Sequence, residues 1–291
     1  SMNVSLQHSF IQMPENEYKP RMTDPRVGYF STQITDMTVA DDPTPYRDMI
    51  HRWHLEKKNP GQERSEVVEP IVWWIENTTP HEFRDAIKEG VLPWNKAFEK
   101  AGLINAIDVQ VQPDDASWDA GDIRYNVLRW TSSPRPPFGG YGPSFVNPRT
   151  GQILGADIML EYVYFTNRVK YQKIYETFSS GFSDISLEGC QAGEMMQQGN
   201  MFGLLAAGSS LQDYSQLEQH KIIYESLVKL TLHEVGHTLG LSHNFFASNL
   251  HSFNNIHDRL AWRPKITTKI DRRELKVEEL VRNFNLEILL D

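Results

Sequence analysis

One short segment constrains the fold of this chain more than any other. His233 and Glu234 begin it, and His237, Gly240 and His243 follow at fixed intervals. Residues four apart on a helix lie one turn apart on nearly the same face, so the first two imidazoles can reach one ion. A continuing helix would carry His243 roughly 15 Å beyond His233. We therefore expect the helix to end at Gly240, where a positive φ turns the chain back and returns His243 to the other two histidines.

The spacing of this segment points to zinc. It fits the pattern H-E-x-x-H-x-x-G-x-x-H at each fixed position. Three neutral imidazoles suit Zn²⁺ and leave a fourth tetrahedral position for water. We predict His233, His237 and His243 as the metal ligands, and Glu234 as the base that takes a proton from the water that the zinc activates. A purely structural zinc, or histidines that merely pack on an amphipathic helix, are the alternatives that the pattern leaves open.

Composition excludes several other kinds of protein. Cys190 is the single cysteine, which rules out an internal disulfide and a cysteine cage for zinc. A formal net charge of −9 and a pI near 5.6 argue against a nucleic-acid partner. No apolar stretch approaches the roughly 20 residues that a membrane span needs.

The acidic residues around Asp114 and Asp115 lack the spacing of a calcium loop, so we expect a surface turn there. Oligomeric state is left open.

Hydrophobic patterning predicts an α+β fold. Apolar or alternating runs predict strands at 71–75, 107–111, 123–129 and 153–160. Between the first two, Thr79–Glu82 combines an N-cap, a proline at the first helical position and a capping-box glutamate, which predicts a helix. That helix is expected to kink near Gly90 and Pro93 and to end at Gly102. A second helical period begins near Leu217 and carries the histidine motif.

The chain divides at about residue 67 in this interpretation. Residues 1–67 are rich in proline and charge, and they are predicted to be an N-terminal extension or a linker from an upstream domain. Residues 68–291 are predicted to form the catalytic domain. Within it, 179–216 is interpreted as a loop insertion, and 260–291 as an atypical C-terminal segment that includes a terminal helix.

Several segments resemble known proteins more closely than the motif alone requires. The motif resembles that of the metzincin clan, and the wider sequence resembles a bacterial family of large, exported zinc-dependent metalloproteases. The resemblance covers about residues 8–259 and is carried by Asp24–Phe30, His51–Lys58, Asp122–Tyr125, Asn147–Asp157 and His233–Asn244. It implies a metzincin-like zincin catalytic domain, with a twisted mixed sheet, an active-site helix and a second long helix. It also implies a secreted protein, periplasmic or extracellular.

The resemblance further implies that the strand at 153–160 borders a cleft and pairs with an extended substrate, with an interior position as the open alternative. The expected function is that of a zinc metalloendopeptidase, a hydrolase that cleaves peptide bonds in a protein or peptide substrate with Zn²⁺ as cofactor. Metzincins have a methionine in a turn after the third histidine, whereas the last methionine here is Met201. This departure favours the alternative of a weakly active or inactive zinc-stabilised peptide-binding module. A metal hydrolase acting on another amide or ester is a third alternative.

Overall fold

The computed structural model describes residues 8–24, 28–38, 46–133, 140–162 and 216–243. Cys190, the terminal segment 260–291 and all but the last residue of the predicted insertion 179–216 lie outside these described residues. The division of the chain at residue 67 stays a prediction.

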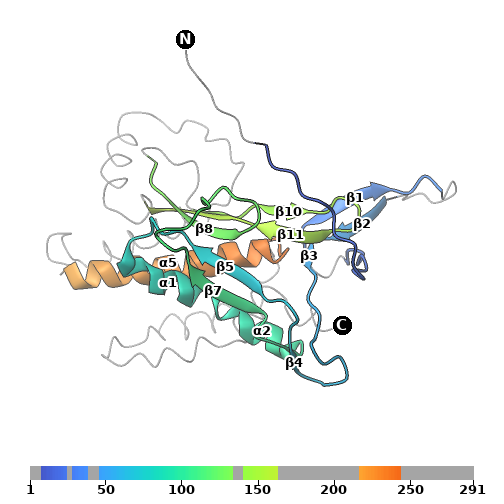
Figure 1. Cartoon of the computed structure of the whole chain (residues 1–291), viewed down its shortest axis with the longest axis horizontal. Helices are drawn as coiled ribbons and strands as arrows, with labels where there is room; N and C mark the ends of the chain where they lie inside the picture. Colours follow the sequence, from blue (N-terminus) through green and yellow to red (C-terminus); the bar gives the residue numbers. More distant parts are fainter. Residues whose placement is uncertain (1–7, 25–27, 39–45, 134–139, 163–215, 244–291) are drawn as a thin grey trace, which may run out of the picture.

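A mixed sheet forms the centre of the described fold (Figure 1). Within the described residues it has five strands in the order β7-β5-β8-β12-β9, which are Ile107–Val111, Ile71–Ile75, Asn126–Thr131, Ile158–Glu161 and Gly140–Tyr141. The first four run parallel, and β9 is antiparallel to β12 at one edge. The predictions for 71–75 and 107–111 are confirmed. The strand predicted at 123–129 starts later because the Tyr125 N–H closes a turn onto the Asp122 carbonyl, 3.1 Å away.

The apolar run at 153–160 is two strands in two different sheets. β11 (Gln152–Ala156) pairs with β10 (Ser144–Val146) and with β3 (Arg52–Trp53), whereas β12 joins the five-stranded sheet. The chain changes sheets at Asp157, whose carboxylate accepts a hydrogen bond from the Val127 N–H at 3.1 Å. The prediction of one continuous strand is therefore wrong. The sequence leaves open whether this run borders the cleft at a sheet edge or lies inside the sheet. Within the described residues β12 lies inside the five-stranded sheet, and β9 forms its edge.

The helices are α1 (His81–Val91), α2 (Trp94–Lys100) and α5 (Gln216–Thr238). The single kinked helix predicted after residue 79 is thus two helices, separated at Leu92 and Pro93. The predicted capping box is also wrong, because no side chain caps α1 among the described residues. Arg84 instead donates to the carbonyls of Asn77 and Thr79, which ties down the segment ahead of the helix. None of the helices described is both long and apolar enough to cross a membrane.

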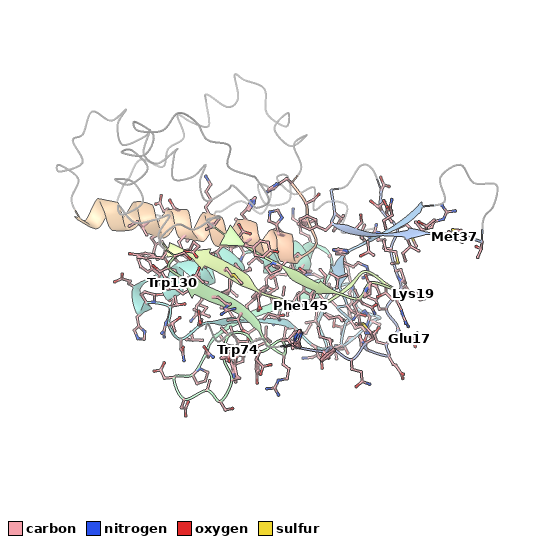
Figure 2. The ribbon with its side chains drawn as sticks, turned by 90° about the horizontal axis from the view of Figure 1, so that it is seen from above. Glu17, Lys19, Met37, Trp74, Trp130 and Phe145 are labelled. Atoms are coloured by element: carbon pink, nitrogen blue, oxygen red, sulfur yellow. The ribbon has the colours of Figure 1, made fainter. Side chains whose placement is uncertain are left out.

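Helices α1 and α5 pack against each other, and their apolar faces share one core with the sheet (Figures 1 and 2). The apolar stripe predicted for the histidine helix is confirmed: Val235 and Leu239 are buried, and Val228 and Leu232 pack against them. The largest fully buried side chains include Trp73, Trp94, Phe83, Ile75, Ile87, Leu128, Ile158, Leu160, Leu227 and Leu230. The core therefore fixes the apolar face of the motif helix from Leu227 to Val235.

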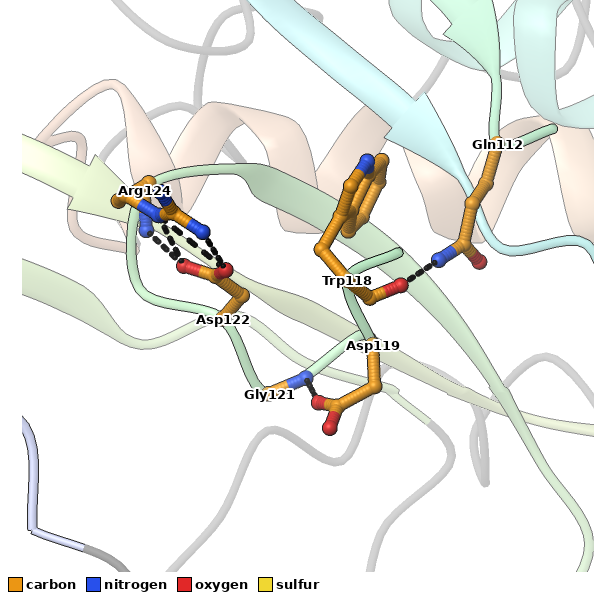
Figure 3. A network of polar contacts seen from close by, with 6 residues as sticks. All are labelled: Gln112, Trp118, Asp119, Gly121, Asp122 and Arg124. Atoms are coloured by element: carbon orange, nitrogen blue, oxygen red, sulfur yellow. Dashed lines mark hydrogen bonds and ion pairs between the residues drawn. The ribbon is translucent and has the colours of Figure 1, made fainter. Parts of the chain in front are cut away.

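A loop after β7 shields the face of the sheet turned away from the helices. Trp118 meets Trp74 edge to face, with ring centroids 5.5 Å apart, and it stacks on Tyr125, with ring centroids 3.8 Å apart. Figure 3 shows how the loop is closed: the Gln112 side chain donates to the Trp118 carbonyl, and Asp122 pairs with Arg124. Asp114 and Asp115 lie in an exposed turn of this loop, as predicted.

The N-terminal part of the described chain adds two small sheets. β1 (Ser31–Thr35) and β2 (Tyr46–Ile50) form an antiparallel pair, and β4 (Ser65–Glu66) pairs in parallel with β6 (Leu103–Ile104). Just before β1, the backbone at 28–30 runs beside the chain at 240–242, immediately after α5. Segments far apart in sequence therefore meet at the end of the motif helix.

Candidate metal centre

The three histidines of the motif converge on one point. The Nε2 atoms of His233 and His243 are 3.0 Å apart, those of His233 and His237 3.1 Å, and those of His237 and His243 3.2 Å. Nitrogens that each lie about 2.0–2.1 Å from a tetrahedral zinc ion are separated by about 3.4 Å, so this group fits the ion. Their geometry is that of a metal-binding cluster, and their role as ligands stays a prediction.

A glycine turn brings His243 back to the helix. Gly240 has a φ of 96°, as the sequence predicts. Its N–H donates to the His237 carbonyl at 2.9 Å, and the Leu241 N–H donates to the Gly236 carbonyl at 3.2 Å. These two bonds define a Schellman motif, which satisfies carbonyls that the end of a helix leaves without partners. The turn thereby brings the third imidazole back toward the other two.

The orientation of His237 is set by a backbone carbonyl. Its Nδ1 atom lies 2.8 Å from the Leu241 oxygen. A carbonyl only accepts, so Nδ1 carries the proton and the lone pair of Nε2 points toward His233 and His243. No sequence signal marks this partner, because any residue at 241 offers a carbonyl.

The surroundings of His233 and His237 favour the neutral form of these two imidazoles. Burial, followed by the proximity of His237 and His243, lowers the pKa of His233 to about 3. Burial also lowers the pKa of His237, although its bond to the Leu241 carbonyl opposes that shift. Metal ligands must be deprotonated, so both shifts act in the direction that favours metal binding at neutral pH.

Glu234 lies on the sheet side of α5, where β9 passes close to it. The residue is buried, and a Cβ atom added to Gly140 would lie 2.5 Å from its Oε1 atom. Gly140 therefore leaves the space that the carboxylate occupies. The sequence places Gly140 in a glycine- and proline-rich stretch without indicating this role.

Two aromatic residues from the N-terminal part also border the centre. The ring of Phe30, which is 43% exposed, lies 5.6 Å from that of His237. Trp53 donates its Nε1–H to the carbonyl of Thr238 at 2.8 Å. Both fall in segments that carry the family resemblance, but their contact with the motif follows only from the fold.

Comparison with known families agrees with this geometry over part of the chain. A family model described as Met-zincin matches residues 215–269, which include the three histidines and Glu234. These findings support a metzincin-type zincin. A second model, described as a domain of unknown function (DUF5117), matches residues 1–58. No curated protein and no solved structure matches the chain. The candidate metal centre thus lies where the two matched segments meet, because residues 28–30 contact the turn at 240–242.

Proposed function

We propose that this chain is a zinc-dependent endopeptidase. In this proposal His233, His237 and His243 hold Zn²⁺, and Glu234 is the general base. The observation that carries it is the convergence of three imidazole Nε2 atoms within 3.2 Å of one another, together with the burial of Glu234, which follows the first of them in the sequence. The Met-zincin match and the cluster of three histidines also support a metallopeptidase-like function in general.

Hydrolysis in this proposal depends on two groups, a bound zinc ion and the carboxylate of Glu234. Bound zinc supplies a Lewis acid, which acidifies water and polarises the carbonyl of the scissile bond. Glu234 removes a proton from the water as its oxygen attacks the carbonyl carbon, and it then delivers that proton to the nitrogen of the breaking C–N bond. The products are a carboxylic acid and an amine, which exchange a proton to become a carboxylate and an ammonium ion, and Glu234 ends the cycle deprotonated as it began.

The substrate in this proposal is an extended stretch of a protein or peptide. β9 is the edge of the five-stranded sheet within the described residues, and Gly140 of β9 touches Glu234. An extended peptide can add to a sheet edge by main-chain hydrogen bonds. Pairing along β9 would carry the scissile bond past the base. On the family resemblance, we propose a periplasmic or extracellular location.

A comparison of three proteins tests the proposal: the wild type, Glu234→Gln, and Glu82→Gln as the matched control. Glu82 is exposed on α1, so its substitution makes the same chemical change away from the centre. Each is assayed for bound zinc and for hydrolysis of an unfolded protein, with and without a chelator. We expect chelator-sensitive cleavage by the wild type and by Glu82→Gln, and loss of at least about a hundredfold in Glu234→Gln with zinc retained.

Equal cleavage by Glu234→Gln would refute the assigned base. Stoichiometric zinc without cleavage of any protein by the wild type would favour the peptide-binding alternative. That alternative draws on the absence of methionine after Met201 in the sequence.

A further inference from the structure

The end of helix α5 is held by a segment that lies about 200 residues earlier in the sequence. The Phe30 N–H donates to the Gly240 carbonyl at 2.8 Å, and the Ser242 N–H donates to the Gly28 carbonyl at 3.0 Å. Tyr29 and Leu241 form the antiparallel bridge between these two bonds. Residues 240–242, within the turn between His237 and His243, are therefore paired with residues 28–30.

Two more contacts from the same part of the chain reach this turn. The indole of Trp53 donates to the Thr238 carbonyl at 2.8 Å, in the last turn of the helix. The carbonyl of His51 packs on Gly240, and the His51 N–H donates to the Phe30 carbonyl at 2.8 Å, which links the two supports. The carbonyls of Thr238 and Gly240 lie where a helix end offers no further partners of its own, so the N-terminal segment supplies donors that this end lacks.

These contacts hold the turn that precedes His243, the one of the three histidines that does not lie on the helix. His233 and His237 lie on α5, which is anchored by the core, whereas His243 follows the turn. An error of a few tenths of an ångström in the turn would move the His243 imidazole relative to the other two. Partners that orient a ligand typically change metal affinity by about 10–100-fold when they are removed.

We infer that Gly28–Phe30 and Trp53 are positioning residues of the metal centre, which set the affinity for Zn²⁺ by fixing the turn that carries His243. The N-terminal segment that contains these residues is then part of the metal site. The inference rests on the proposed function only in assuming that the three histidines bind zinc. It says nothing about which bond is cleaved.

Trp53→Phe in the full chain is the test, because it removes the indole N–H and keeps an aromatic ring. Trp94→Phe is the matched control: Trp94 also donates its Nε1–H to an α5 carbonyl, that of Leu232 at 3.1 Å, which precedes His233 in the part of the helix that the core anchors and not in the turn that carries His243. Zinc affinity is measured by competition with a chromogenic chelator, and ligand geometry by the visible absorption of the Co²⁺-substituted protein. Thermal unfolding of the metal-free proteins reports stability separately.

We expect Trp53→Phe to weaken zinc binding about tenfold and to alter the Co²⁺ spectrum. Trp94→Phe is expected to lower the melting temperature while leaving both metal readouts unchanged. Equal zinc affinity in Trp53→Phe and the wild type, or an equal loss in both variants, would overturn the inference while leaving the proposed function intact. A wild type that binds no zinc would instead overturn the proposed function.

A second pair of variants tests the strand itself. Phe30→Pro removes the N–H that donates to Gly240, whereas Phe30→Ala keeps it and removes the ring. We expect weaker zinc binding in the proline variant than in the alanine variant at equal helical content by circular dichroism. Equal affinities at equal helical content would count against a role for the backbone pairing.

Discussion

The carbonyl oxygen of His51 lies against the α-carbon of Gly240, in the space that a Cβ atom would fill. Gly240 also has a φ of 96°, in the left-handed region that side chains with a Cβ disfavour. Two independent constraints, one of backbone conformation and one of packing against the N-terminal segment, thus require glycine at the turn that returns His243.

Gly240→Ala is therefore expected to destabilise the fold. The left-handed conformation costs about 1–2 kcal/mol for alanine, and the clash with His51 adds about 1–3 kcal/mol. Urea unfolding should show a loss of about 2–5 kcal/mol. Gly61→Ala is the control, because an added Cβ there meets no atom within 4 Å, and its change should stay within about 0.5 kcal/mol. A stability for Gly240→Ala equal to that of the control would contradict the two constraints.

Gly140→Ala tests the space occupied by Glu234. The new methyl group would lie 2.5 Å from Oε1, so the carboxylate must move. Displacement of a catalytic group by about 1 Å can cost about a hundredfold, and we expect kcat to fall about ten- to a hundredfold with zinc content unchanged. Steady-state kinetics beside the Gly61→Ala variant measure the effect. Unchanged kcat would show that Glu234 tolerates the shift or does not act as the base.

Zinc should stabilise the chain through His243. A metal that binds only the folded state, present at a hundredfold excess over its Kd, adds about 2.7 kcal/mol. Differential scanning fluorimetry with and without Zn²⁺ should show a rise in Tm for the wild type and a much smaller one for His243→Ala. His81→Ala, which alters an exposed histidine on α1, should respond like the wild type. The same rise in all three proteins would place the zinc elsewhere.

Acid should weaken the metal-free protein through His233. Its pKa falls to about 3 in the folded chain, whereas the unfolded chain takes up the proton below about pH 6.5. The stability that depends on neutral His233 is thus fully present above about pH 6.5 and is lost as the pH falls toward 3.

Between pH 7 and pH 5 this histidine alone should remove about 2 kcal/mol. Urea titrations of the chelator-treated protein at pH 7, 6 and 5 measure the loss, and His233→Asn is the comparison. The variant should lose about 2 kcal/mol less than the wild type over the same range. Equal losses of unfolding free energy in the wild type and the variant between pH 7 and pH 5 would show that His233 is not held neutral by its surroundings.

The local pattern of residue types was sufficient to predict the elements whose formation depends on residues close together in the sequence. The strands at 71–75 and 107–111, the helical period from about Leu217, and the positive φ of Gly240 all follow from residue type and spacing, and the structure confirms them. Local pattern failed at Asp157, where a carboxylate takes the Val127 N–H and the chain changes sheets. It also failed at α1, where no described side chain forms the expected cap.

The sequence by itself determined which residues could meet at a metal ion, because helical spacing and a glycine turn act over a few residues. Only the tertiary structure decided what holds that arrangement in place. Gly140 beside Glu234, the His51 carbonyl on Gly240, and the Trp53 indole on Thr238 each join segments about 90 to 190 residues apart. Contacts of this kind depend on the packing of sheet, strand and helix, and no local pattern of residue types encodes them.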